Sequence, residues 1–146
     1  MKWQWLIVCL VVGLVLVGCG AKREVPAQTK QVIAPTPEAA LTKVDSAIAK
    51  LEEALGGQDV DAVRRAIMTL TKELGGLASH ISTADLEAAQ AAQEAGQRPP
   101  EALMDKLGPA IDAADRALSA VIPPKNDVAA AAQALIEIKK GVDAVR

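Results

Sequence analysis

Beyond residue 36, apolar side chains recur three and four positions apart, with polar and charged residues between them. This spacing places the apolar residues on one stripe of a helix, as in the seam of a helical bundle. The first stripe runs to Gly56-Gly57 and the second to Gly75-Gly76, and both glycine pairs are interpreted as helix stops. The two stripes consist of Leu41, Val44, Ile48, Leu51 and Leu55, and of Val60, Val63, Ile67, Leu70 and Leu74.

Residues at the start of these two segments have the chemistry of helix caps. Thr36 precedes Pro37, an order that is typical of an N-cap followed by the first helical residue. Asp59 occupies the same position ahead of the second stripe. We therefore expect two antiparallel helices that are joined by a short turn.

The region from Leu77 to Arg98 lacks a comparable stripe. Residues 77–83 are predicted to form a loop, and Ser82 with Asp85 resembles a capping box for a short helix over 84–95. That helix is alanine-rich and has one large apolar residue, so it contributes little to a core. Two roles fit it: a crossover within the bundle, or a contact surface for another protein.

Two further stripes follow the break at Arg98-Pro99-Pro100 and predict the last two helices. Pro109 lies inside the first of them and is expected to kink or split it near Lys106, because proline removes a backbone hydrogen bond. Pro123-Pro124 ends that helix, and Asn126 is expected to cap the next one. The stripes consist of Met104, Leu107, Ile111, Ala114, Leu118 and Val121, and of Val128, Ala131, Leu135, Ile138, Val142 and Val145.

Four long amphipathic helices, one short alanine-rich helix and no strand pattern predict an all-α fold, an up-and-down antiparallel helical bundle over residues 36–146. Charged residues make up 23% of the chain and the net charge is -2, which argues against disorder and against a nucleic acid partner. The chain has no Phe or Tyr, and its two tryptophans are Trp3 and Trp5. Aromatic platforms for sugars or nucleobases are therefore lacking in the bundle sequence.

The N-terminal residues follow a different pattern. Lys2 precedes an apolar run from Leu6 to Val17, which is shorter than the about 20 residues of a membrane-spanning helix. A positive residue followed by an apolar run of this length is typical of a signal peptide. The run ends in Leu16-Val17-Gly18-Cys19, which resembles the lipobox of a bacterial lipoprotein precursor.

This resemblance covers residues 1–19 only, and it implies a lipid anchor. The Cys19 thiol would receive diacylglycerol, residues 1–18 would be removed, and the new amino group would be acylated by a chain such as palmitate. Two or three acyl chains hold a protein stably on a membrane, whereas a single chain binds reversibly. Gly20 follows the cysteine, and the resemblance then implies the outer membrane if the source is Gram-negative.

Residues 19–35 contain no helical stripe and include two prolines, so they are predicted to be a flexible linker between the lipid and the bundle. The expected organisation is a signal peptide over 1–18, the lipidated cysteine and linker over 19–35, and the bundle over 36–146. Cys9 lies in the segment that would be removed. The single remaining cysteine would be modified, which excludes an intrachain disulfide or a zinc site built from several cysteines.

No residue pattern predicts a catalytic, cofactor or metal site. The Cys-x-x-Cys-His motif of covalent haem is absent, and one histidine cannot supply the two Glu-x-x-His pairs of a bundle di-metal site. Adjacent serine and histidine residues are poorly placed as nucleophile and base, and paired acids on a surface helix usually face solvent. The residues considered are His80, Met68 and Met104 for haem, and Ser79, His80, Asp112 and Asp115 for catalysis.

We therefore expect a membrane-anchored, non-enzymatic bundle that acts in the cell envelope as a structural or accessory protein-binding module. Its expected partners are the membrane, through the lipid, and another protein. The alternative is a carrier that binds a small molecule or a metal between its helices, and an enzyme of unrecognised type is a third hypothesis.

Overall fold

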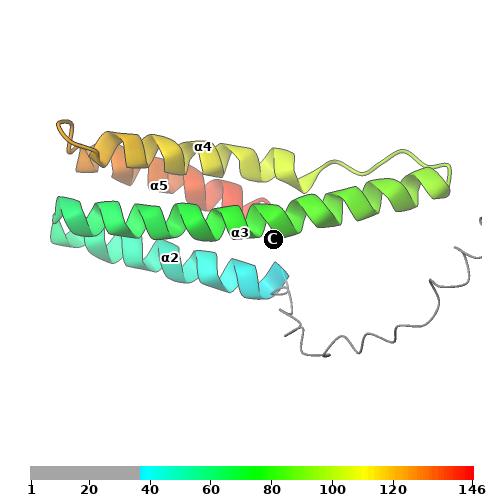
Figure 1. The fold of residues 1–146 in the computed structure, drawn as a ribbon, viewed down its shortest axis with the longest axis horizontal. Helices are drawn as coiled ribbons and strands as arrows, with labels where there is room; N and C mark the ends of the chain where they lie inside the picture. The colour runs from blue at the N-terminus through cyan, green and yellow to red at the C-terminus, as the bar shows by residue number, and fades with distance from the viewer. Residues whose placement is uncertain (1–36) are drawn as a thin grey trace, which may run out of the picture. The chain divides into compact units, whose positions relative to one another are not determined.

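The computed structural model describes residues 37–146, and the predictions for Thr36, Cys19 and the first 35 residues lie outside the described residues. Between residues 37 and 146 the chain forms four helices, which pack as an all-α bundle, so the predicted fold class is confirmed (Figure 1). The helices are α2 (Pro37–Gly57), α3 (Val60–Glu94), α4 (Leu103–Val121) and α5 (Val128–Asp143). Each packs against the next in the chain, and α2 meets α5 through a smaller interface.

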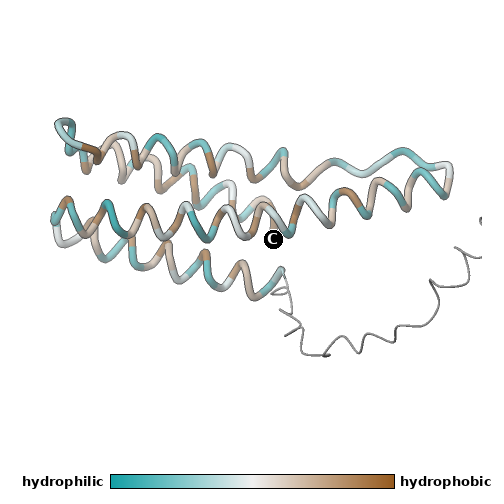
Figure 2. The backbone as a smooth tube through the Cα atoms, in the orientation of Figure 1, coloured by the Kyte–Doolittle hydropathy of each residue, from teal (hydrophilic) through white to brown (hydrophobic). Residues whose placement is uncertain are grey.

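The core of this bundle is almost entirely apolar within the described residues: no polar or charged residue is buried as a whole, and the Thr71 hydroxyl oxygen is a buried side-chain polar atom without a hydrogen-bond partner. Apolar positions recur along each helix between stretches of polar ones (Figure 2). The predicted stripes supply all of the largest fully buried side chains except Leu77, and alanines fill the positions where helices approach closely. Those large side chains are Leu51, Ile67, Leu70, Leu74, Leu77, Leu107, Ile138, Val44, Val63, Val121 and Val142.

The largest correction concerns α3, which runs unbroken for 35 residues. The predicted stop at Gly75-Gly76 is wrong, as are the loop over 77–83 and the separate helix over 84–95. Leu77 and Ile81, which both lie within the expected loop, are buried core residues. Their burial outweighs the glycines, which cost a helix about 1 kcal/mol each relative to alanine.

The last third of α3 extends beyond the ends of α2 and α5 (Figure 1). Ile81 is the last buried residue of α3, and residues 95–102 then return the chain to the start of α4. We call residues 82–94 the α3 projection. It belongs to the same helix as the core residues before it, so the separate helix and its local capping box at Ser82 are both absent.

The proline in α4 does not split that helix. α4 is continuous from Leu103 to Val121 with Pro109 inside it, so the predicted break near Lys106 is wrong. Ala110, one residue further on, is fully buried, and the packed face of α4 therefore spans the proline. The predicted end before Pro123-Pro124 is confirmed, because the helix ends at Val121.

The start of α5 is shifted by one residue from the prediction. Asp127, not Asn126, is the N-cap, and its carboxylate accepts a hydrogen bond from the Ala130 N–H at 2.9 Å. Asn126 instead adopts a left-handed backbone conformation with φ of 48°, which asparagine tolerates better than most residues. Asn126 therefore forms the turn, and the adjacent Asp127 is the N-cap of α5.

α4 and α5 approach each other closely where Gly141 faces Ala110. A β-carbon at Gly141 would lie 2.7 Å from the Ala110 Cβ, a separation that real atoms do not tolerate. Glycine at this position thus lets the two backbones pack at short range, as small residues do in tightly packed helix pairs.

No helix between residues 37 and 146 has the length and apolar character needed to cross a membrane.

Candidate functional site

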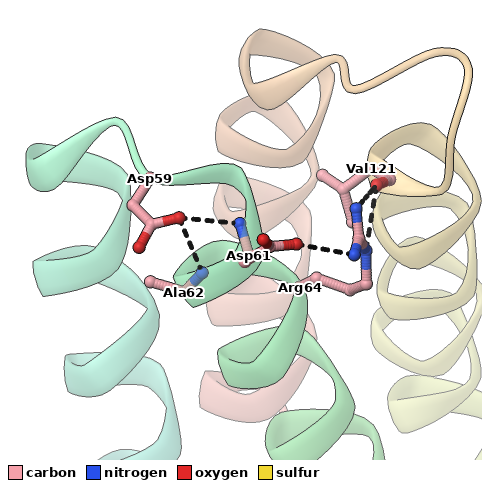
Figure 3. A network of polar contacts seen from close by, with 5 residues as sticks. All are labelled: Asp59, Asp61, Ala62, Arg64 and Val121. Atoms are coloured by element: carbon pink, nitrogen blue, oxygen red, sulfur yellow. Dashed lines mark hydrogen bonds and ion pairs between the residues drawn. The ribbon is translucent and has the colours of Figure 1, made fainter.

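Polar contacts at the turn end of the bundle hold α3 to α4. The Asp59 carboxylate caps α3 by accepting hydrogen bonds from the Asp61 N–H at 2.9 Å and the Ala62 N–H at 3.3 Å. The Arg64 guanidinium donates to the Val121 carbonyl from Nε at 3.2 Å and from Nη2 at 3.1 Å (Figure 3). Its Nη1 atom pairs with the Asp61 carboxylate at 2.7 Å. Arg64 therefore satisfies a carbonyl that the end of α4 leaves without a helical partner.

The opposite end of α4 is held by the α3 projection. The Asp85 carboxylate accepts hydrogen bonds from the N–H groups of Leu103 at 3.0 Å and Met104 at 2.9 Å. Ala102, the N-cap residue of α4, has no side chain that could do so. Asp85 thus acts as a cap from another helix, whereas the sequence pattern predicted that it caps its own.

The interface between α2 and α5 is bridged by two ion pairs on the surface. The Lys139 Nζ atom lies 2.8 Å from the Glu52 Oε1 atom, and Arg146, which follows the end of α5, pairs with Asp45. The hydrogen bond with Glu52 and then the charge of Glu52 raise the pKa of Lys139 above its ordinary value of 10.5. These charges connect the first and last described helices.

The residues considered for haem do not converge on a buried site. His80 is a partly buried residue of α3 and not a loop residue, so its predicted position is wrong. Met68 is 57% exposed, whereas Met104 packs against the core. A haem ligand in a bundle must face the interior, and Met68 does not.

The residues considered for catalysis lie on the surface of the bundle. Ser79 is an exposed residue of α3, and Asp112 and Asp115 are exposed residues of α4. The two acids line an open hollow together with Arg116, and Arg116 pairs with Glu137. Among residues 37–146, no group of three or more His, Cys, Asp or Glu side chains is placed to hold a metal ion.

A large hollow on the described surface lies beside the turn between α4 and α5. It is open and has a volume of about 690 Å³. Two of its charged residues already have structural contacts, because Asp127 caps α5 and Arg116 pairs with Glu137. The hollow is lined by Asp115, Arg116, Ser119, Ala120, Lys125, Asp127 and Ala130.

The outward side of α3 has a composition that the fold itself does not explain. Met68 and Leu86 are large, apolar and exposed, at 57% and 59%. Gly75 and Gly76 lie between them, and a β-carbon at either glycine would meet no atom within 4 Å. Sequence reasoning missed this surface because it ended the helix at the glycines.

Comparison with known proteins gives no relative from which a role could be transferred. The chain matches no protein-family model, no curated protein and no solved structure.

Proposed function

We propose that this protein is a bacterial lipoprotein that is anchored to a membrane of the cell envelope by lipid on Cys19. The observation that carries the proposal is the sequence Leu16-Val17-Gly18-Cys19 directly after a short apolar run. Each position fits the lipobox, and Lys2 supplies the positive start of the signal peptide. Gly20 favours the outer membrane, on its periplasmic side, in a Gram-negative cell.

We further propose that the bundle is not an enzyme and acts by contact, as a structural or accessory protein-binding module. Its described interior is filled with apolar side chains that pack against one another. Several of its charged side chains cap helices or join one helix to the next, as Arg64, Asp85 and Asp127 do. These observations support a role for the outer surfaces of the helices, where a partner protein would bind.

Intact-mass measurement of the protein from the membrane fraction tests the anchor. We expect a species that lacks residues 1–18 and carries the added mass of a diacylglycerol. Cys19→Ala should accumulate as the full-length precursor, because the processing enzyme of lipoproteins acts on the modified cysteine. Cys9→Ala is the matched control and should be processed normally. A wild-type protein of full length and without lipid would contradict the proposal.

The tryptophans offer a second readout of the same cleavage. Trp3 and Trp5 are the only strong absorbers near 280 nm in a chain without tyrosine. The processed protein should therefore show almost no absorbance at 280 nm, whereas the Cys19→Ala precursor should retain the absorbance of two tryptophans.

Recovery of the lipidated protein from native membranes tests the contact role. We expect specific envelope proteins to co-purify with it. We also expect the recovered protein to show no visible absorbance and to carry no stoichiometric metal. A protein that comes alone and carries a bound metal or chromophore would favour the carrier hypothesis instead.

A further inference from the structure

We propose that the outward face of α3 is an interface between two copies of this chain, which pair with their α3 helices antiparallel. This face consists of Asp61, Arg65, Met68, Thr69, Lys72, Gly75, Gly76, Ser79, Thr83, Leu86, Glu87, Gln90 and Glu94. All thirteen residues are exposed in the single chain, so the face is free for a partner. The inference concerns the bundle alone and does not depend on lipidation at Cys19.

The two large apolar residues of this face have a self-complementary spacing. Met68 and Leu86 are eighteen residues apart in one continuous helix, which is five whole turns, so they lie on the same side about 27 Å apart. Their midpoint is the level of residue 77. A two-fold axis at that level places Met68 against the partner's Leu86, and Leu86 against the partner's Met68.

Small residues lie where this axis would pass. Gly75, Gly76 and Ser79 flank the midpoint on the exposed side. No atom of the chain's own fold fills the space next to either glycine. Small side chains at the crossing point let two helices approach closely, so a second α3 helix accounts for glycines that the single chain does not require.

Charge separation along the face selects a second copy, and it selects the antiparallel orientation. Arg65 and Lys72 lie on one edge of the half of α3 that is inside the bundle. Asp61 is an acid on the same side of this half, and Arg64 already pairs with it. Glu87 lies twenty-two residues after Arg65, and Glu94 lies twenty-two residues after Lys72. Twenty-two residues are about six turns, so the two acids lie on the same edge of the α3 projection. Antiparallel pairing brings each cationic half near the partner's acidic half. Parallel pairing would place like charges together, which is unfavourable.

These four charges are available for such pairing. Within residues 37–146, no ion pair or hydrogen bond involves the charged side-chain group of Arg65, Lys72, Glu87 or Glu94; the Arg65 backbone carbonyl accepts a hydrogen bond from the Thr69 hydroxyl. The guanidinium of neighbouring Arg64, by contrast, is occupied by Asp61 and Val121. Pairing would also support the α3 projection, which extends past α2 and α5 in the single chain (Figure 1). In the dimer it lies beside the first half of the partner's α3.

Site-specific photo-crosslinking of the full-length chain in its own membrane tests the interface. Benzoylphenylalanine at position 86 should give a band of twice the chain mass, and the crosslinked peptide should come from residues 65–72 of a second copy. The matched control is position 136, because Ile136 is an exposed apolar residue of α5, and it should give no such band. A crosslink only to another protein, to another region of the chain, or to no protein would overturn the proposal.

Reversing charges on the outward face of α3 is a second test of the interface. Arg65→Glu with Lys72→Glu should lower the crosslink yield at least about fivefold, because the opposite-charge contacts at both symmetry-related ends of the interface become repulsive. Adding Glu87→Lys and Glu94→Lys should restore the yield, which a variant that merely misfolds would not do. A yield that is unchanged by the first pair of substitutions, or not restored by the second, would overturn the antiparallel register.

Substitution of the two glycines distinguishes a loss of dimer contact from a loss of folding. Gly75→Ala with Gly76→Ala adds two methyl groups at the crossing point and should lower the crosslink yield while the chain folds at least as well as wild type. A yield equal to that of wild type would exclude close contact at the level of residue 77.

Discussion

The Asp85 carboxylate of α3 accepts a hydrogen bond from the Met104 N–H in the first turn of α4, at 2.9 Å. At the far end of α4, the Arg64 guanidinium donates to the Val121 carbonyl. One helix thus places an anion at the N-terminus and a cation at the C-terminus of its neighbour, and both charges complement the dipole of α4. The two contacts lie about 30 Å apart along α3 and fix the register of the two helices.

Removing the carboxylate should destabilise the bundle. Asp85→Ala is expected to lower the free energy of unfolding by about 0.5 to 2 kcal/mol, the range for loss of an N-cap. Asp85→Asn should lose less, because the amide oxygen still accepts one hydrogen bond. Chemical denaturation of a protein of residues 36–146 measures both. Ser82→Ala, at an exposed position of the same projection and outside the outward face, is the control and should stay within about 0.5 kcal/mol of wild type.

The role of Asp85 also marks the limit of what the sequence predicts. Ser82 and Asp85 have the spacing of a capping box, which is a local pattern. The actual acceptor role joins residues eighteen and nineteen positions apart, and only the three-dimensional packing creates it. The helix stripes, by contrast, depend on short-range spacing and the amphipathic period, and for that reason they were predictable.

Gly75-Gly76 in α3 is a helix-stop signal that the burial of neighbouring apolar side chains outweighs. Leu70, Leu74, Leu77 and Ile81 keep the three- and four-residue spacing through Gly75 and Gly76, and all four are buried. Burial of such side chains contributes about 1.5 to 3 kcal/mol each, which exceeds the helix penalty of two glycines. The outward face of α3 was not predictable, because it exists only when the helix continues.

Gly141 should be intolerant of a side chain. Gly141→Ala places a methyl group 2.7 Å from the Ala110 Cβ, so α4 and α5 must separate. We expect a loss of about 1 to 3 kcal/mol in the free energy of unfolding, the range for overpacking a core. Ala110→Gly in the same chain should recover part of the loss, and the double-mutant cycle measures the interaction.

Gly76→Ala is the matched control for this substitution, because it places the same methyl group at an open position of a helix interior. It should stabilise the bundle by about 1 kcal/mol through helix propensity alone. Equal effects of the two glycine substitutions would contradict the close approach at Ala110.

The effect of replacing a leucine with alanine should depend sharply on its burial. Leu51 and Leu70 are fully buried, so Leu51→Ala and Leu70→Ala are each expected to cost about 2 to 5 kcal/mol. Leu86→Ala removes the same atoms from an exposed position and should change the stability of the single chain by less than about 0.5 kcal/mol. Thermal or urea unfolding separates the two classes, and similar small losses at all three positions would refute the packing of the core.

The ion pair between Lys139 and Glu52 predicts a pH dependence on the alkaline side. The hydrogen bond with Glu52, followed by the charge of Glu52, raises the pKa of Lys139 in the folded state above 10.5. A raised lysine pKa stabilises the folded state fully below the unfolded-state pKa, and this contribution disappears as the pH rises through the folded-state pKa.

Glu52→Gln isolates this contribution. The difference in stability between wild type and this variant should be constant from about pH 8 to 9 and shrink above the unfolded lysine pKa of about 10.4, because other lysines titrate alike in both proteins. NMR titration of the Lys139 side chain should show a lower pKa in the variant. Glu53→Gln changes a neighbouring exposed acid that forms no ion pair with a described residue, and it should leave both measurements unchanged. A stability difference that persists undiminished above the folded-state pKa of Lys139 would show that Glu52 acts through packing and not through the charge of Lys139.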